Sequence, residues 1–341
     1  MTRETPKNPE RYQMQELLSA IQKADSILLF PHVSPDGDTV GSTLALKMVL
    51  ERMQKKVILV LDGVVPPNLF FLPDLYCFRT PQDVGTQLNL KNANALAIAV
   101  DVADFGRLGS SEALFRSIAV TAQIDHHGTN PAFAQINLVD EQAPATAILV
   151  SRLQQELGLP IEQGEAICLY TGLSTDTGNF VFENTNAEAF QLMGRLMEAG
   201  LPLAKYSRLL FKRKDRAFLR LLSKTLPTMT FFCHGEIAGL QLSLQDMRSA
   251  QATGENTEGL VDYAIDASGV KMAYFARETE SGEVKVSLRA LSPYRVDRVA
   301  ALFGGGGHLL AAGCTLAPPL DEAVERLREA LVKAREGSLE A

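Results

Sequence analysis

The chain has 341 residues, of which 46% are hydrophobic, and its formal net charge is −7. This length is enough for two domains, and the acidic balance argues against a protein that holds long duplex nucleic acid by neutralising phosphates. No apolar run is long enough to span a membrane and residues 1–10 are too polar for a signal peptide, so we expect a soluble cytoplasmic protein without a membrane partner.

The first half of the chain predicts helices that alternate with buried strands. Asn8-Pro9-Glu10 is typical of a helix start, and an apolar stripe at helical spacing continues to Ile21. Apolar runs predict strands at 27–30, 57–61, 95–100, 117–124 and 136–139. Helices are expected at 41–53, 145–157 and 161–173, and 66–87 is expected to be a loop with a short helix at most. The alternation indicates an α/β fold with a parallel sheet covered on both faces.

The second half changes character. Helices are expected at 187–199 and 203–222, followed by short β-rich runs at 230–233, 237–242, 272–276 and 284–290. Two further helices are expected at 296–303 and 320–335. We therefore predict an N-terminal parallel-sheet domain over 1–200, a helical linker over 201–225, and a smaller mixed-sheet α/β domain over 226–341, with a cleft between the domains.

Two groups of side chains allow a plain structural interpretation. The basic cluster at residues 208–220 is either a solvated helix face or linker, or one wall of a cleft that faces an anionic ligand. Its members are Arg208, Lys212, Arg213, Lys214, Arg216 and Arg220. The four cysteines are far apart and include no CxxC pair, which favours buried reduced thiols over a zinc or redox site.

Histidines and aspartates gather where three of the predicted strands end. They are His32, Asp36, Asp38, Asp101, Asp125, His126 and His127, and Asp176 follows in a later segment. Because open α/β sheets bind ligands at the carboxyl ends of their strands, we expect these side chains to lie close together. A single aspartate could cap a helix and a single histidine could be a structural imidazole, but so large a set exceeds what capping requires.

These carboxylates would repel one another unless cations lay among them. Imidazole and carboxylate ligands together favour manganese, with magnesium or cobalt as alternatives, and exclude a thiolate zinc site. The set is large enough for two divalent cations, and a pair of such ions is the usual device for in-line phosphoryl displacement.

A glycine run at 304–307, closed by His308, follows a predicted helix in the second domain. Glycines let the backbone approach a ligand closely and offer N–H groups to a phosphate. A flexible turn would explain the run equally well on its own. With His308 beside it and Arg289 on a preceding strand, the sequence favours ligand binding.

Four segments, in this order, resemble the successive motifs of the DHH phosphoesterases: HVSPDGDTVGS, VDVADFGRLG, IDHHGTN and TGLSTDTGNF. GGGGHLLAAG resembles the glycine motif of the DHH-associated C-terminal domain. Within this family, the chain is most similar to the bacterial oligoribonuclease (nanoRNase)/pAp phosphatase subfamily. The features that carry this similarity are the overall length and the segments NTEGLVDYA and VSLRA. The resemblance covers nearly the whole chain.

The resemblance implies a site for two divalent cations, most often Mn²⁺. One ion would be held by His32, Asp36 and Asp101, and the second by Asp38, Asp101, His126 and Asp176. Asp125 would orient the histidines, and His127 would contact the scissile phosphate or the leaving oxygen. The substrate's nucleotide and phosphate parts would be held by Arg289, Gly305, Gly306, Gly307 and His308.

The resemblance further implies a phosphodiesterase and phosphatase. It would hydrolyse short oligoribonucleotides or linear dinucleotides to mononucleotides, and 3′-phosphoadenosine 5′-phosphate (pAp) to AMP, through attack of a metal-bridging hydroxide on phosphorus. Hydrolysis of pyrophosphate, polyphosphate or cyclic dinucleotides is an alternative, and a non-catalytic nucleotide or RNA sensor is another. Leu309 and Leu310 stand where family members commonly carry lysine, often followed by asparagine, which leaves the preferred substrate open. Cleavage polarity and oligomeric state, a homodimer included, are open as well.

Overall fold

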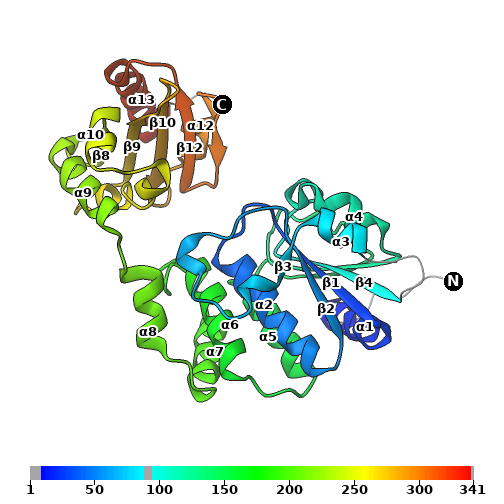
Figure 1. The fold of residues 1–341 in the computed structure, drawn as a ribbon. Helices are drawn as coiled ribbons and strands as arrows, with labels where there is room; N and C mark the ends of the chain where they lie inside the picture. Colours follow the sequence, from blue (N-terminus) through cyan, green and yellow to red (C-terminus); the bar gives the residue numbers. More distant parts are fainter. Residues whose placement is uncertain (1–8, 88–93, 339–341) are drawn as a thin grey trace. The chain divides into compact units, whose positions relative to one another are not determined.

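The structure is a computed structural model that describes residues 9–87 and 94–338. The chain divides between Arg213 and Lys214 into two compact units, each built on a six-stranded sheet (Figure 1). This division falls inside the linker predicted for 201–225, while the predicted domain bounds and the cleft between the domains stay predictions. The expected cap Asn8 lies outside the described residues.

The sheet of the first unit is parallel throughout and has the strand order β3-β2-β1-β4-β5-β6. Its strands are β1 (Ser26–Pro31), β2 (Lys56–Val60), β3 (Phe78–Arg79), β4 (Ala95–Val100), β5 (Val120–Asp125) and β6 (Ile136–Val139). The strand order reverses between β1 and β4, which lie next to each other. Open α/β sheets bind ligands at such a switch point, outside the carboxyl ends of the strands.

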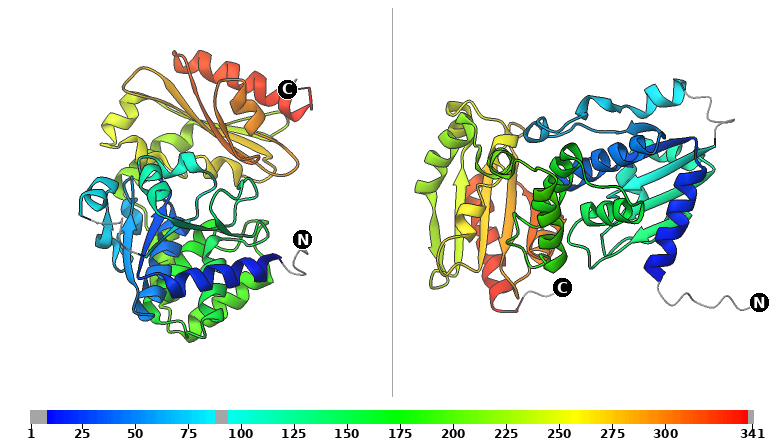
Figure 2. Two further views of the ribbon diagram at one scale, coloured as in Figure 1. Left: turned by 90° about the vertical axis from the view of Figure 1, so that its right-hand side faces the viewer. Right: turned by 90° about the horizontal axis from the view of Figure 1, so that it is seen from below.

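Helices cover both faces of this sheet, as the alternating pattern predicted (Figures 1 and 2). The helices described in this unit are α1 (Pro9–Lys23), α2 (Gly37–Arg52), α3 (Pro81–Gln87), α4 (Ser111–Ser117), α5 (Thr146–Glu156), α6 (Gln163–Asp176), α7 (Ala187–Glu198), which packs on α5 and α6, and α8 (Leu203–Ser207). Leu29 of β1 belongs to the core that includes α2, α5 and α6. Its neighbours Leu28 and Phe30 belong to the core on the other face, where Phe30 meets Phe115 of α4 edge to face.

Two glycines let α2 and α6 approach closely. A Cβ added at Gly41 would lie 2.4 Å from the carbonyl oxygen of Cys168, and one at Gly172 would lie 2.5 Å from Asp38 Oδ1. Side chains at these positions would therefore push the two helices apart. The close contact matters for the site because α2 carries Asp38 and α6 ends at Asp176.

The second unit is the smaller mixed-sheet α/β fold that the sequence predicts, with the strand order β11-β12-β10-β9-β8-β7. Its strands are β7 (Thr230–Phe232), β8 (Ile237–Leu242), β9 (Met272–Glu278), β10 (Val284–Ala290), β11 (Gly306–Gly307) and β12 (Ala311–Leu316). Its helices are α9 (Arg216–Thr225), α10 (Leu244–Ser249), α11 (Asp262–Ile265), α12 (Asp297–Ala301) and α13 (Leu320–Arg335). Only β8 and β9 run parallel; the other pairs are antiparallel.

Three predictions of local structure were wrong. The helix expected over 203–222 is broken: α8 continues as a π-helix over Arg208–Lys212 and a new helix begins after Asp215, whose carboxylate accepts from the Phe218 N–H at 2.5 Å. Aspartate favours the N-cap, so it starts α9 at this point. The segment 66–87 contains the edge strand β3 as well as α3. The prediction omitted α4, α10, α11, β11 and β12.

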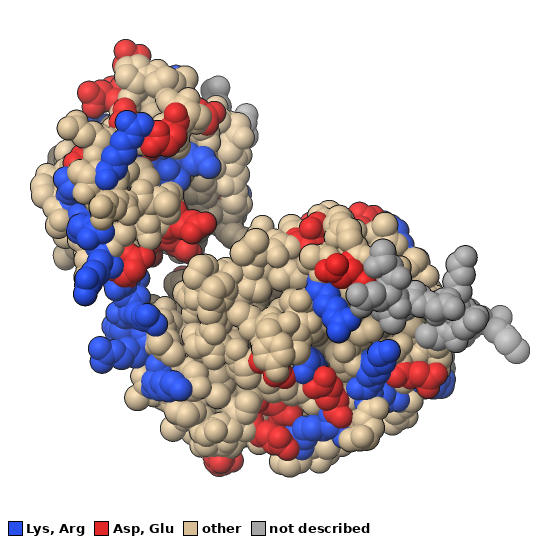
Figure 3. Space-filling view, in the orientation of Figure 1, with Lys and Arg blue, Asp and Glu red and all other residues tan. Residues whose placement is uncertain are grey.

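The basic cluster is spread over different local environments. Arg208 and Lys212 lie on the π-helix, Lys214 Nζ lies 4.8 Å from the centroid of the Phe218 ring, and Arg220 donates to the carbonyl of Ala250. Figure 3 shows lysines and arginines gathered over α9 and the segment that precedes it. All four cysteines are free thiols, and Cys168 and Cys314 are buried. In the described part of the chain, no helix has both the length and the apolar character that crossing a membrane requires.

Replacement of Gly41 by alanine should destabilise the protein, because the new methyl group meets the backbone of α6. Overpacking of this kind costs about 1–3 kcal/mol. Gly194, in α7, is the matched control: nothing lies within 4 Å of a Cβ added there, so Gly194→Ala should stabilise the protein by up to about 1 kcal/mol. Urea unfolding of both variants measures the difference. Equal effects would show that α2 and α6 do not need a glycine at their contact.

Candidate metal centre

The predicted ligands meet at the carboxyl edge of β1, β4 and β5, beside the switch point. Three overlapping groups of side chains each have their ligand atoms within 4.8 Å of one another. The groups are His32, Asp36 and Asp101; Asp38, His126 and Asp176; and Asp101, His126 and His127. The structure thus brings together all six residues that were predicted to bind metal, and it adds His127 to them.

Asp101 lies at the centre of these groups. Its Oδ2 is 3.7 Å from His32 Nε2 and its Oδ1 is 3.8 Å from His126 Nε2, so its two oxygens face opposite halves of the site. The residue is buried and its backbone is left-handed, with φ of 61°. The hydroxyls of Thr39 and Thr146 donate to Oδ2 and Oδ1 at 2.5 and 2.9 Å. These contacts fix the carboxylate in an orientation that can serve two cations.

The ring of His126 is oriented so that Nε2 faces the carboxylates of its half of the site. Its Nδ1 lies 3.2 Å from the carbonyl oxygen of Ala143. Because a carbonyl only accepts, Nδ1 must carry the proton, and in the neutral ring Nε2 has a free lone pair. That nitrogen lies 3.1 Å from Asp176 Oδ2 and 4.0 Å from Asp38 Oδ2. Nε2 is therefore the ring nitrogen that could bind a cation held among these carboxylates.

The turn after β1 delivers the remaining ligands. Asp36 caps α2 through Oδ1, which accepts from the N–H groups of Asp38 and Thr39, and its Oδ2 lies 3.9 Å from His32 Nε2. Asp38 points the other way and is fully buried. Its carboxylate accepts from the N–H groups of Thr146 and Ala147, at the start of α5. The two aspartates therefore face different halves of the site.

The carboxylates raise one another's pKa values. Burial, followed by the charges of Asp101 and Asp176, raises the pKa of Asp38 well above its usual value. Burial, then Asp101 and Asp36, raises the pKa of Asp176 to about 8. Such shifts mean that the ionised set is unstable without a compensating positive charge. Divalent cations bound by imidazole and carboxylate oxygens fit this set of donors.

His127 is held by a separate contact. Its Nδ1 lies 2.8 Å from Asp125 Oδ1, and Asn130 donates to the other oxygen of this carboxylate at 2.6 Å. The hydrogen bond to Asp125 is the main reason that the pKa of His127 is raised to about 9. His127 is therefore a cation at neutral pH in the metal-free chain. Asp125 orients this histidine, whereas the carbonyl of Ala143 orients His126.

Arg107 belongs to the site, although the sequence analysis gave it no role. It is half-buried, and its Nη2 lies 3.2 Å from Nε2 and 3.3 Å from Nδ1 of His32. Burial lowers the pKa of His32, and the charge of Arg107 lowers it further against the opposing effect of Asp101. Its position in the quoted segment VDVADFGRLG, six residues after Asp101, was the available signal.

The predicted substrate-binding residues lie in the second unit. Arg289 is on β10 opposite Ala311 of β12, and its Nε lies 3.3 Å from Asp262 Oδ1. The His308 N–H donates to the carbonyl of Ala311 at 2.8 Å, just after Gly306 and Gly307, which pair with β12. The glycine motif and Arg289 therefore flank the same strand.

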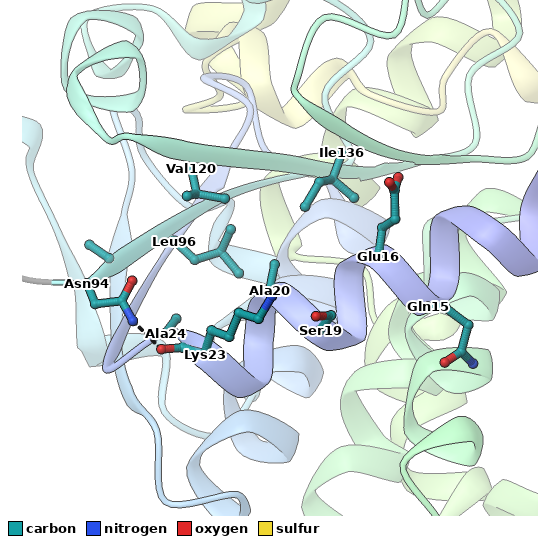
Figure 4. A pocket seen from close by; sticks show the side chains of 11 residues that line it. Gln15, Glu16, Ser19, Ala20, Lys23, Ala24, Asn94, Leu96, Val120 and Ile136 are labelled. Carbon is teal, nitrogen blue, oxygen red and sulfur yellow. Dashed lines mark hydrogen bonds between the residues drawn. The ribbon is translucent and has the colours of Figure 1, made fainter. Parts of the chain in front are cut away.

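A pocket of about 500 Å³ lies at the opposite, amino edge of the first sheet (Figure 4). The starts of β4, β5 and β6 line it together with α1, and its charged lining residues are Glu16 and Lys23. None of the three histidine–aspartate groups contributes to it. The candidate metal ligands of this unit therefore lie at the carboxyl edge, away from this pocket.

Comparisons with known proteins agree with this geometry. The chain matches the DHH family, N-terminal domain, over residues 26–173 and the DHHA1 domain over residues 235–334. A Thermus thermophilus protein named bifunctional oligoribonuclease and PAP phosphatase NrnA is 33% identical over 95% of both chains. A Bacillus subtilis protein of the same name is 25% identical over 88% of this chain and 92% of its own. The crystal structure of an exopolyphosphatase-related protein from Bacteroides fragilis is 25% identical and superposes with a TM-score of 0.89 over the whole of both chains.

The pKa of Asp176 predicts how the metal-free protein responds to pH. Between about pH 4, where an aspartate titrates in an unfolded chain, and about 8, the folded state holds a proton here that the unfolded state has lost. Folding therefore takes up a proton, and stability should fall as the pH rises through this window. Asp176→Asn should make the fall shallower, because asparagine does not titrate.

Urea unfolding in EDTA at pH 5 and pH 8 measures this effect. With Mn²⁺ added, the wild-type protein should gain more stability at pH 8 than at pH 5, since metal and protons compete for the same carboxylates. An unchanged pH dependence in Asp176→Asn would contradict the repulsion described for this site.

Proposed function

The chain belongs to the DHH family of phosphoesterases, and on this basis we propose that it hydrolyses short oligoribonucleotides, linear dinucleotides and pAp with the help of two divalent cations. The observation that carries the proposal is the central position of Asp101, with one carboxylate oxygen toward His32 and the other toward His126. A single buried carboxylate in this orientation is what two neighbouring cations would share.

The side chains divide into two ligand sets. His32, Asp36 and Asp101 would hold one ion, and Asp38, Asp101, His126 and Asp176 would hold the other. Mn²⁺ is the ion we favour, because imidazole and carboxylate are mixed among the ligands, with Mg²⁺ or Co²⁺ as alternatives. When bound, such ions acidify water and neutralise charge that develops on phosphoryl oxygens.

The protein's own residues would supply the proton chemistry and the positioning. With its Nδ1–H held by Asp125, His127 would present Nε2 to the leaving oxygen and donate a proton to it as a general acid. Arg107, beside His32, can bind a non-bridging oxygen of the scissile phosphate. In the second unit, Arg289, the glycine motif and His308 would bind the part of the substrate beyond that phosphate.

The relatives' names support the choice of substrates. Two of them are named oligoribonuclease and PAP phosphatase, which is the pair of activities that we propose here. Polyphosphate is the second candidate substrate, because the similar Bacteroides fragilis structure is named an exopolyphosphatase-related protein. The complete set of carboxylates and imidazoles at the candidate metal centre argues against a sensor without catalysis.

Asp101→Asn should lower the rate of hydrolysis by roughly a thousandfold or more, since it removes the one charged group that both ligand sets share. Asparagine is the suitable replacement, because it tolerates the left-handed backbone of this position. Asp25→Asn, at the amino edge of the same sheet, is the matched control and should keep full activity. Turnover of pApA with Mn²⁺ measures both variants. Near-normal turnover by Asp101→Asn would refute the two-metal assignment.

A substrate panel with Mn²⁺ should rank pApA and pAp above pyrophosphate and polyphosphate. Arg289→Ala should raise KM for pApA and pAp about tenfold to a hundredfold, because it removes a charge-assisted hydrogen bond to phosphate. Pyrophosphate hydrolysis should be much less affected. Preferred turnover of polyphosphate would favour the second candidate. If the protein binds nucleotide tightly but hydrolyses no substrate with any divalent cation, the sensor is favoured.

A further inference from the structure

The second unit contains a pocket of about 620 Å³, and Arg289 is the one residue of its lining that has a role in the proposed function. It lies between the loop around the 3₁₀ turn Gly254–Thr257 and the neighbouring strands β9 and β10. Arg289 forms one part of its lining, and Arg277 and Ser287 form another. A pocket of this size is within the range that holds a nucleotide-sized ligand. All of its lining residues belong to the second unit.

Arg277 stands out among the residues of this pocket. Its side chain is half-buried, and it makes no hydrogen bond or ion pair with any residue that the structure describes. Its guanidinium lies against the loop backbone, because a Cβ added at Gly254 would be 2.7 Å from Arg277 Nη2. Burial alone lowers the pKa of this arginine, with no carboxylate acting against it. Arginines that are withdrawn from water usually have an anionic partner, and the described part of the chain offers none.

The strand register puts Arg277 and Arg289 on one face of the sheet. Arg277 of β9 lies opposite Lys285 of β10, and Arg289 follows four residues later on β10. Because side chains alternate along a strand, Lys285, Ser287 and Arg289 share a face, and Arg277 shares it through the ladder. The two arginines are therefore separated by roughly 13 Å along the strand direction. Ser287, between them, forms no side-chain hydrogen bond with a described residue.

Two carboxylates also line the pocket, Glu255 and Glu258. Both are exposed, and neither forms an ion pair with Arg277 or Arg289. Exposed carboxylates are well hydrated and act weakly at a distance, so they reduce the attraction for an anion without neutralising the arginine. Arg289 differs from Arg277, because Asp262 already lies 3.3 Å from its Nε.

We propose that this pocket is a subsite for an additional phosphate group of the substrate, bound by Arg277 and Ser287 beyond the phosphate that Arg289 holds. The inference rests on the proposed function. A dinucleotide such as pApA or the nucleotide pAp carries only enough phosphates for the metal centre and Arg289. A trinucleotide carries one more, so Arg277 selects for chains of three or more nucleotides.

Steady-state kinetics with Mn²⁺ on pApA and pApApA tests the subsite. Arg277→Ala should lower kcat/KM for pApApA about tenfold to a hundredfold, the effect of losing one charge-assisted hydrogen bond, and should leave pApA within about twofold. For Arg277→Lys, kcat/KM for pApApA should lie between the values of the wild type and Arg277→Ala, because lysine keeps the charge but loses the planar fork of donors.

Lys285→Ala is the matched control. Lys285 lies opposite Arg277 in the ladder and is exposed, but it does not line the pocket. This variant removes the same charge from the same face, and its ratio of pApApA to pApA kcat/KM should equal that of the wild type. An equal loss in both variants would show a general electrostatic effect and would overturn the subsite. An equal loss on both substrates in Arg277→Ala would overturn it as well.

Direct binding separates this inference from the proposed function. Calorimetry with Asp101→Asn and pApApA, repeated with the double variant Asp101→Asn/Arg277→Ala, measures the subsite without turnover. If the wild-type protein hydrolyses none of the substrates, the proposed function fails. The subsite still stands if the double variant binds the trinucleotide about tenfold or more weakly, and it fails if both bind equally.

Discussion

The first unit is organised by the mutual repulsion of buried carboxylates. Asp38 and Asp101 are buried, and Asp176 is close to both, yet no lysine pairs with them in the described part of the chain. The Nε2 atom of His126 faces the same carboxylates, 3.1 Å from Asp176 Oδ2. Threonine hydroxyls hold the Asp101 carboxylate and backbone N–H groups hold that of Asp38, so these two carboxylates cannot relax by moving apart. Because these carboxylates are held close together, their full ionisation requires added positive charge, which divalent cations would supply.

The fold provides the means of holding this set together. The strand order reverses between β1 and β4, so His32 and Asp101 emerge side by side at one edge. Gly41 and Gly172 let α2 and α6 meet closely, which sets Asp38 and Asp176 on the same side. Packing and chemistry are therefore coupled: a side chain at Gly172 would reach the Asp38 carboxylate itself.

Much of the site could be predicted from sequence because apolar runs end where its polar residues begin. His32, Asp101 and Asp125 each end or follow a buried strand, and this pattern is local. Asp176 ends a helix far along the chain, and its assignment to the second ligand set came from the family resemblance. The role of Arg107 was missed, since an arginine in a loop gives no periodic signal. The role proposed for Arg277 was missed as well, because only the three-dimensional structure shows that its side chain has no partner among the described residues.

The errors in secondary structure have similar causes. The strand β12 lies within a run of small residues after the glycine motif, where apolar alternation is weak, and its pairing with β10 supplies the missing stabilisation. The single helix expected over 203–222 does not form, because the Asp215 side chain competes for the backbone and begins a new helix. Both outcomes were decided by contacts that propensity does not include.

The most direct test of this account is anomalous diffraction from crystals grown with Mn²⁺. The account predicts two peaks, one beside His32 and Asp36 and one beside Asp38, His126 and Asp176, with the Asp101 carboxylate between them. One peak alone, or peaks at other carboxylates, would contradict the claim that Asp101 joins two cation sites.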